Sequence, residues 1–316
     1  MNHRRIDVHH HVLPPSYVSW LKKEGIGYSG GRALPDWSVS STQDLMGKYG
    51  IETAILSLST PGVCLRLVEG KNDEGRRWAR EVNEFSAQLS QEQPGRFGFF
   101  ATLVLPDLDG AIDEAAYALD TLHASGVILL ANNHGKYLGD ESDHPLFAEL
   151  DRRRAVIFIH PSELPGPGIP GIPAFAADFL LDTTRAAYRL VRNGFLKRYP
   201  NLKIILSHAG GFVPYASHRM AAAVSQDARR PVDEVLEDFR SFYFDTALSG
   251  SPAALPSLLA FAKPGHVLFG SDWPFAPEEA VAYFTGHLDA YRALDESGRK
   301  AIDRDSALGL FPKFSA

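Results

Sequence analysis

Eight short apolar runs alternate with segments of helical spacing along this chain of 316 residues. Each run is rich in β-branched and aromatic residues and is apolar almost throughout, which is typical of parallel strands buried on both faces. Between the runs, sets such as Trp78, Val82, Phe85 and Leu89 fall on one face of a helix. The predicted strands are Ile6–Val12, Thr53–Ser59, Phe97–Leu103, Val127–Ala131, Val156–His160, Lys203–His208, Phe242–Thr246 and Val267–Asp272.

Eight strand–helix units predict an α/β fold, a (β/α)8 TIM barrel, for which about 250 residues are typical. We expect a single domain over residues 1–316. An open, doubly wound sheet is the alternative, but no glycine fingerprint follows the first strand. Two segments exceed what a barrel needs. They are an insertion after strand 1, Leu13–Met46, and a loop after strand 5, Pro161–Pro173, which holds five prolines and three glycines.

The charge and the apolar runs argue against nucleic-acid and membrane partners. The net charge of -6 is spread along the chain, with no basic stripe. Runs such as Gly126–Ala131 are too short to span a bilayer, and no apolar signal-peptide stretch follows Arg4 and Arg5. Cys64 is the only cysteine, which excludes an intramolecular disulfide and suits a reducing compartment. We therefore expect a cytoplasmic protein.

Metal-competent side chains gather at the ends of four predicted strands. His9 and His11 alternate along the first strand and so share a face, as a half-site for a transition metal requires. His160, His208 and Asp272 end the fifth, sixth and eighth strands. Each alone has a structural explanation, such as an exposed histidine cluster or a turn aspartate. Because the carboxyl ends of barrel strands face one rim, their joint occurrence predicts a metal site there.

Four segments of the chain resemble the amidohydrolase superfamily. They are Asp7-Val8-His9-His10-His11, Ile159-His160-Pro161, Leu206-Ser207-His208-Ala209-Gly210-Gly211 and Leu268-Phe269-Gly270-Ser271-Asp272-Trp273-Pro274. The chain is most similar to the branch of the 2-amino-3-carboxymuconate-6-semialdehyde decarboxylases. Within it, Ser57-Leu58-Ser59-Thr60-Pro61-Gly62 resembles the 6-methylsalicylate-type decarboxylases. This resemblance implies a metal-dependent decarboxylase of aromatic or dienoic acids, assembled as a homodimer or larger.

The resemblance also implies a ligand set. It assigns His9, His11, His160 and Asp272 to the metal and places His208 close to the metal as an acid–base group. Binuclear members of the superfamily carry a bridging lysine on the fourth strand, but Gly126–Asn133 contains none, which favours one divalent ion. Zinc suits a set rich in nitrogen best, and manganese or magnesium stays open.

The expected reaction is the non-oxidative decarboxylation of a salicylate-like hydroxybenzoic acid, with Asp272 as proton donor and His208 as its acid–base partner. Arg219 is expected to hold a substrate carboxylate, its alternative being a solvent-facing helix arginine. Trp273 and Phe275 are expected to line the ring pocket, with core packing as the alternative. The same metal site could instead activate water in a hydrolase of a lactone or amide. A hydratase and a regulatory metal-binding barrel are further alternatives.

Overall fold

The computed structural model describes residues 3–68 and 70–315 and contains eight parallel strands that pair in chain order. The last strand returns to the first through backbone hydrogen bonds, from Val8 N to Phe269 O (3.0 Å) and from Asp272 N to His9 O (2.7 Å). The predicted (β/α)8 barrel is therefore confirmed. Its strands are β1 (Arg5–His11), β4 (Ile51–Ser57), β5 (Phe97–Thr102), β6 (Gly126–Leu130), β9 (Val156–His160), β10 (Lys203–Leu206), β11 (Tyr243–Asp245) and β12 (Val267–Leu268).

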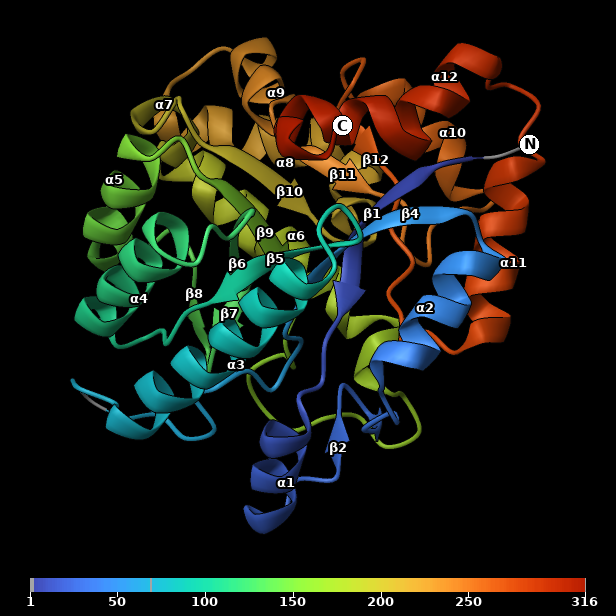
Figure 1. Ribbon diagram of the computed structural model, residues 1–316. Coiled ribbons are helices and arrows are strands. Elements are labelled where there is room, and N and C mark those ends of the chain that lie inside the picture. The colour runs from blue at the N-terminus through green and yellow to red at the C-terminus, as the bar shows by residue number, and fades with distance from the viewer. Residues whose placement is uncertain (1–2, 69, 316) are drawn as a thin grey trace.

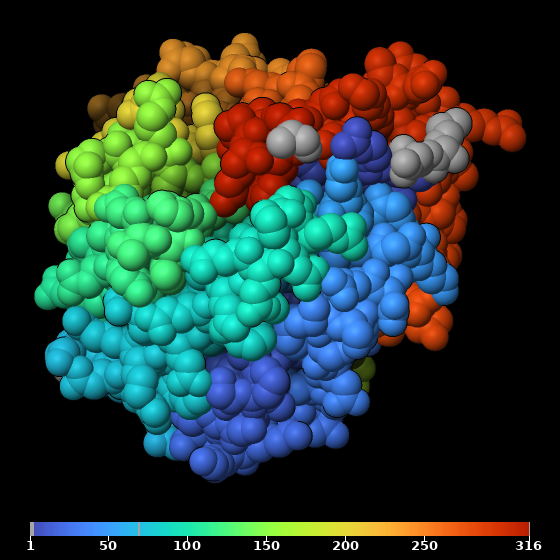
Figure 2. All heavy atoms as spheres, viewed as in Figure 1, coloured from blue at the N-terminus to red at the C-terminus, as the bar shows by residue number. Residues whose placement is uncertain are grey.

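Helices surround the barrel and join consecutive strands, as the right-handed crossover of parallel strands demands (Figure 1). In the space-filling view they hide most of the strands (Figure 2). None of the helices described is long and apolar enough to cross a membrane. The helices are α1 (Pro15–Lys23), α2 (Val39–Lys48), α3 (Asp73–Glu92), α4 (Leu108–Asp120), α5 (His144–Arg152), α6 (Asp178–Arg192), α7 (Phe195–Arg198), α8 (Val213–Ala228), α9 (Val232–Arg240), α10 (Ala254–Phe261), α11 (Glu278–Asp289), α12 (Glu296–Lys300) and α13 (Ser306–Leu310).

Helix α3 illustrates how local sequence fixes these elements. The Asn72 side chain accepts a hydrogen bond from Gly75 N and caps the first turn, which also carries acidic side chains that favour a helix N-terminus. Trp78, Val82 and Leu89, which the sequence places on one face, are all buried. The amphipathic pattern and the cap therefore agree, and the predicted helix is confirmed.

The interior of the barrel is apolar at the amino ends of the strands. Phe100 and Phe158 stack there with ring centroids 5.3 Å apart, and Phe311 from the C-terminal segment packs against Phe100. In Figure 1 the C-terminus lies at this end of the barrel, opposite α1 and β2. The C-terminal segment thus closes the amino end, so a polar site has room only at the carboxyl end.

Four predicted strands are shorter than expected, and in two of them, β10 and β12, the difference changes how a candidate site residue is presented. β10 ends at Leu206, and His208 begins the 3₁₀ helix η3 (His208–Gly210). β12 ends at Leu268, well before Asp272. His208 has φ of 52° and Asp272 has φ of 63°, values that a strand does not permit and that non-glycine residues adopt at a cost. Both side chains are therefore presented on turns just beyond their strands.

Both extra segments lie over the carboxyl ends of the strands. The segment expected as an insertion after the first strand contains α1, the start of α2 and the hairpin of β2 (Tyr28–Ser29) and β3 (Arg32–Ala33). The proline-rich loop after β9 has no regular structure and leads into the 3₁₀ helix η2 (Ala174–Ala176). The two segments meet where Phe175 N donates to Gly30 O at 3.0 Å. A second short hairpin, β7 (Asn132–Asn133) with β8 (Lys136–Tyr137), follows β6.

Candidate metal centre and substrate pocket

Three imidazoles and one carboxylate converge at the carboxyl end of the barrel. His9 and His11 come from β1, His160 ends β9, and Asp272 lies beyond β12. One donor atom of each lies within 4.8 Å of the others. The Nε2 atoms of His9 and His11 are 3.1 Å apart, and they lie 3.2 and 3.1 Å from Asp272 Oδ1. Donors bound at about 2.0–2.1 Å to one zinc ion are separated by similar distances.

The outer hydrogen bonds of these imidazoles fix which nitrogen faces inward. His9 Nδ1 contacts Asp245 Oδ2 at 2.7 Å, His11 Nδ1 contacts Ser57 O at 3.1 Å, and His160 Nδ1 contacts Pro161 O at 2.9 Å. A carboxylate or carbonyl oxygen only accepts, so each Nδ1 must carry the hydrogen. Each neutral ring then turns an Nε2 lone pair toward the centre.

Four electron-pair donors thus face one another in a site that water barely reaches. The three histidines are at most 2% exposed and Asp272 is 6% exposed. Burial by itself lowers the pKa of His9, but the carboxylates of Asp245 and Asp272 raise it to about 10, so without a cation His9 carries a second proton on Nε2, at the position where it would bind a metal ion. Burial also lowers the pKa of His11 and, with the neighbouring imidazoles, holds that of His160 well below its ordinary value. A cation at the centre satisfies all four donors, so this arrangement fits a metal ion.

Close backbone approach brings β1 and the Asp272 turn together. At Gly270 an added Cβ would come within 2.9 Å of His9 Cβ, a distance that real Cβ atoms do not adopt. The glycine therefore lets the turn pass against β1. Asp7 reinforces the contact, because its carboxylate accepts from His9 N and from Ser271 N, each at 3.0 Å.

His208 lies beside the ligands without joining them. Its Nε2 is 3.5 Å from Asp272 Oδ2, the carboxylate oxygen that faces away from the two β1 imidazoles. Its Nδ1 is buried and has no hydrogen-bond partner in the described part of the chain. His208 also lines the pocket in front of the ligands. It is therefore placed to exchange a proton with Asp272 or with a bound molecule.

Asp245 is a functional residue that the sequence reasoning missed. Besides holding His9 Nδ1 with Oδ2, it accepts from His208 N (2.9 Å) and Ala247 N (3.0 Å) with Oδ1. One side chain thus positions both a metal ligand and the acid–base histidine. The available signal was that Asp245 is the only carboxylate of its predicted strand and stands near its end.

A small pocket lies in front of the ligands. Phe275 lines it, and its ring lies edge-on to His11 with centroids 5.3 Å apart. Trp273 is not among the lining residues and packs partly buried against the outer core. The other lining residues are Ser29, Gly30, Arg32, Ser59, Thr60, His160, Phe175, Phe179, His208, Leu248 and Asp272.

The arginine at this pocket is Arg32 rather than Arg219. Arg219 is exposed on α8 and is not among the pocket residues of this chain. Arg32, on β3, lines the pocket, with its guanidinium carbon 4.5 Å from the centre of the Phe175 ring. It also donates to Phe275 O, which fixes the side chain at the pocket wall. Sequence pattern did not indicate this residue, because it lies in an irregular insertion.

Comparison with known proteins identifies the family of this chain. A family model described as Amidohydrolase matches residues 6–313. The chain belongs to this family. Decarboxylase yanB of Aspergillus niger is 42% identical over 327 residues, covering 98% of this chain and 88% of that protein. The 6-methylsalicylic acid decarboxylase of Penicillium expansum is 40% identical over 321 residues, covering 98% and 96%.

A solved structure supports the same assignment. A crystal structure of a protein described as an amidohydrolase II superposes with a TM-score of 0.89 at 31% identity, covering 98% of this chain and 99% of that one. The expected family and the resemblance to 6-methylsalicylate-type decarboxylases are confirmed. The expectation of a carboxy-lyase is also confirmed, because relatives about 40% identical over nearly the whole chain are named decarboxylases.

We predict one metal equivalent per chain, lost on replacement of His11 by alanine. The substitution removes one of four converging donors and leaves the buried Asp272 carboxylate with fewer partners. His218→Ala, which changes an exposed histidine on α8, serves as the matched control and should keep the metal. Elemental analysis of dialysed protein measures both. Two equivalents in the unmodified protein, or full occupancy in His11→Ala, would contradict the prediction.

We predict that Asp245→Asn weakens metal binding about 10- to 100-fold, as is common when a residue that orients a metal ligand is changed. Asp245 Oδ1 must still accept from two backbone amides, so the asparagine NH₂ would face the hydrogen of His9 Nδ1. His9 would then have to turn or move its hydrogen to Nε2. Competition with a fluorescent chelator measures the affinity, and an affinity equal to that of the unmodified protein would show that Asp245 does not orient His9.

Proposed function

We propose that this protein is a metal-dependent decarboxylase of a salicylate-like acid, and that 6-methylsalicylate is the first substrate to try. The supporting observation is the arrangement of the pocket. His160 and Asp272 of the proposed metal ligands line it, and an arginine and three phenylalanine rings line other parts of its wall. Such a pocket matches an aromatic ring that carries oxygen ligands along one edge and an alkyl group elsewhere. The name of the relative from Penicillium expansum agrees with this substrate.

The chemical difficulty of this reaction is the electron pair left when carbon dioxide departs. Direct cleavage would leave an aryl carbanion. Protonation of the ring carbon that carries the carboxylate avoids it, because the ring then accepts the electrons of the breaking carbon–carbon bond and becomes aromatic again. The balance is one proton gained and one carbon dioxide lost, with no oxidant or organic cofactor. The protein must therefore hold the carboxylate and phenolic oxygens and deliver one proton.

Asp272 and His208 are the proposed proton-handling pair. Asp272 presents Oδ1 to the imidazoles and Oδ2 toward His208, so one oxygen can bind the ion while the other carries a proton. His208, with its free Nδ1, can return a proton to Asp272 or stabilise the phenolic oxygen. A divalent ion held by His9, His11, His160 and Asp272 would supply Lewis acidity toward the substrate oxygens.

Arg32 and the aromatic wall are proposed to bind and orient the substrate. A guanidinium fits a carboxylate or phenolate well, and Arg32 is held at the wall by its contacts with Phe175 and with Phe275 O. The rings of Phe175, Phe179 and Phe275, with Leu248, are proposed to enclose the substrate ring and its alkyl group. Excluding water in this way strengthens the interactions between the charged groups.

We propose zinc as the resident ion, because three imidazole nitrogens and one carboxylate form a set that zinc prefers. Manganese and magnesium favour oxygen-rich sets, and here the protein would contribute one oxygen ligand beside three nitrogens. Reconstituting metal-stripped protein with each ion and measuring turnover decides among them.

We predict carbon dioxide release from 6-methylsalicylate or another ortho-hydroxybenzoate by metal-replete protein. Asp272→Asn should retain part of the metal through its amide oxygen yet lose at least about 100-fold in kcat, because an amide cannot deliver the proton. Near-normal turnover in metal-replete Asp272→Asn would assign the proton to another group. Hydrolysis of a lactone or amide with no carbon dioxide from any hydroxybenzoate would favour the hydrolase alternative.

We predict that Arg32→Met raises KM for the aromatic acid by about 10- to 100-fold, the value of a charged hydrogen bond of roughly 1.5–3 kcal/mol. Arg292→Met, which changes an exposed arginine that does not line the pocket, is the matched control. Arg219→Met tests in the same way the arginine that the sequence predicted to hold the substrate carboxylate. A rise in KM for Arg219→Met without one for Arg32→Met would move the anchoring role to Arg219.

A further inference from the structure

The hairpin of β2 and β3 forms one wall of the metal pocket. Ser29, Gly30 and Arg32 all line the pocket, and all three belong to the hairpin or its turn. A two-stranded hairpin with strands this short is only marginally stable alone in water. Its position, and with it the position of the Arg32 guanidinium, must therefore come from contacts with the barrel.

Three hydrogen bonds fasten the turn of this hairpin to two different segments. Gly30 N donates to Glu163 Oε1 at 2.7 Å, and Phe175 N donates to Gly30 O at 3.0 Å. Ser29 Oγ donates to Thr60 O at 2.7 Å. Of the groups that accept or donate in these bonds, the Glu163 carboxylate is the only one supplied by a barrel-side side chain.

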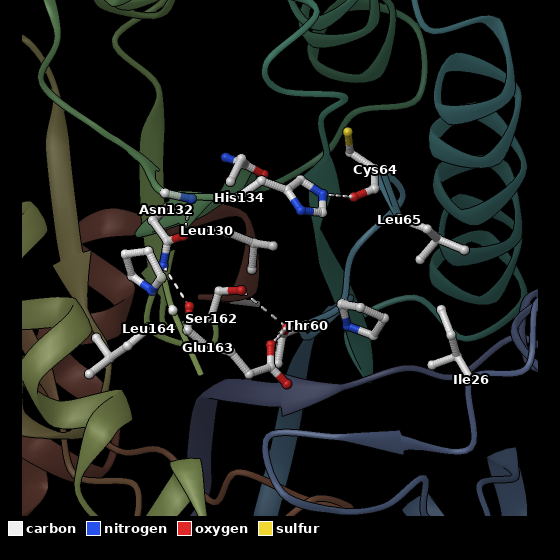
Figure 3. Close-up of a pocket in the computed structure, with 15 residues that line it drawn as sticks. Ile26, Thr60, Cys64, Leu65, Leu130, Asn132, His134, Ser162, Glu163 and Leu164 are labelled. Carbon is white, nitrogen blue, oxygen red and sulfur yellow. Dashed lines mark hydrogen bonds between the residues drawn. The ribbon is translucent and has the colours of Figure 1, made fainter. Parts of the chain in front are cut away.

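Glu163 also joins the two segments that receive the hairpin. Its Oε2 accepts from Thr60 Oγ1 at 3.1 Å, and Thr60 Oγ1 lies 3.3 Å from Ser162 Oγ (Figure 3). Its backbone oxygen accepts from Asn132 Nδ2 at 3.0 Å, which ties the proline-rich loop to the end of β6. One carboxylate thus links the loop after β4, the loop after β9 and the hairpin.

The docking of the hairpin is tight as well as hydrogen-bonded. Gly30 has φ of +62°, and a Cβ there would come within 2.6 Å of Phe179 Cζ. Gly31 has φ of +86°, and its Cβ would come within 2.9 Å of Ala174 N. Only glycine permits this turn so close to η2 and α6. The hairpin therefore has one defined packing position against η2 and α6, and the hydrogen bond to Glu163 stabilises it there.

The Glu163 carboxylate places a negative charge close to the metal pocket. The residue lines a second, outer pocket that shares Thr60 with the metal pocket (Figure 3). Within residues 3–68 and 70–315 no basic side chain pairs with this carboxylate. A free negative charge beside a pocket for an anionic acid repels that acid. In the structure this carboxylate accepts two hydrogen bonds, from Gly30 N and from Thr60 Oγ1.

We propose that Glu163 is a positioning residue of the reaction, which latches the β2–β3 hairpin over the metal pocket and so places Arg32 against the substrate. This inference rests on the proposed function only for the identity of the substrate. Without the latch the hairpin is seated for a smaller fraction of the time. The apparent affinity for substrate then falls by that fraction, whereas the chemistry of the seated state is unchanged.

The test compares Glu163→Ala with Glu163→Gln in metal-replete protein. Glutamine can accept from Gly30 N with its amide oxygen and donate to Thr60 Oγ1 with its amide nitrogen, so it restores both contacts without the charge. We expect Glu163→Ala to raise KM for 6-methylsalicylate about tenfold with kcat within about twofold, the equivalent of one to two net hydrogen bonds. Glu163→Gln should stay within about threefold of the unmodified enzyme in both constants.

Hydrogen exchange of residues 28–33 supplies a readout that needs no turnover. Glu163→Ala should speed exchange of the Gly30 amide at least about fivefold, and Glu163→Gln should not. The proposal is overturned if Glu163→Ala leaves exchange or KM unchanged, or if Glu163→Gln behaves as Glu163→Ala does. If the unmodified protein turns over no hydroxybenzoate, the proposed function fails, and the exchange of the Gly30 amide still decides whether Glu163 holds the hairpin.

Discussion

The hydrogen bonds made by three histidine Nδ1 atoms determine what the mouth of this barrel can bind. Asp245, Ser57 O and Pro161 O each accept from one ring, so every ring turns a lone pair inward toward Asp272. Four such donors, buried and about 3 Å apart at their closest, repel one another unless a cation lies between them. The metal-binding character of the site therefore depends on its outer hydrogen bonds as much as on the ligands.

The barrel supplies the conditions that this site needs. Aromatic side chains and the C-terminal segment fill the amino end, which leaves the carboxyl end as the place for polar groups. His208 and Asp272 sit there on turns with positive φ, conformations that the surrounding packing must enforce. The insertion and the proline-rich loop then cover the ligands, and the insertion adds Arg32 to the pocket. Phe175 in η2, Phe179 in α6 and Phe275 beyond Asp272 add the aromatic rings. The pocket therefore combines charged groups with an apolar wall that excludes water.

The sequence predicted the strands, the helices and the set of proposed metal ligands. It did not predict most of the other residues that line the pocket. Strand β9 was predicted with its observed bounds, because a parallel strand that is buried on both faces consists of one continuous apolar run. The ends of β10 and β12 were wrong, since nothing local announces a positive φ at His208 or Asp272. Asp245 was missed even though it stands at a strand end. Arg32 was missed because an irregular insertion has no repeating pattern of apolar residues from which side-chain direction can be predicted.

The sequence by itself determined that eight strands alternate with helices and that His9, His11, His160 and Asp272 lie at or just beyond strand ends that must share a rim. Those statements follow from local periodicity and from the one way in which parallel strands can close. Only the tertiary structure decided that Arg32 rather than Arg219 lines the pocket, that Trp273 turns away, and that Glu163 contacts the hairpin. These contacts join residues far apart in the chain through loops, where side-chain direction is set by packing and not by any repeat in the sequence.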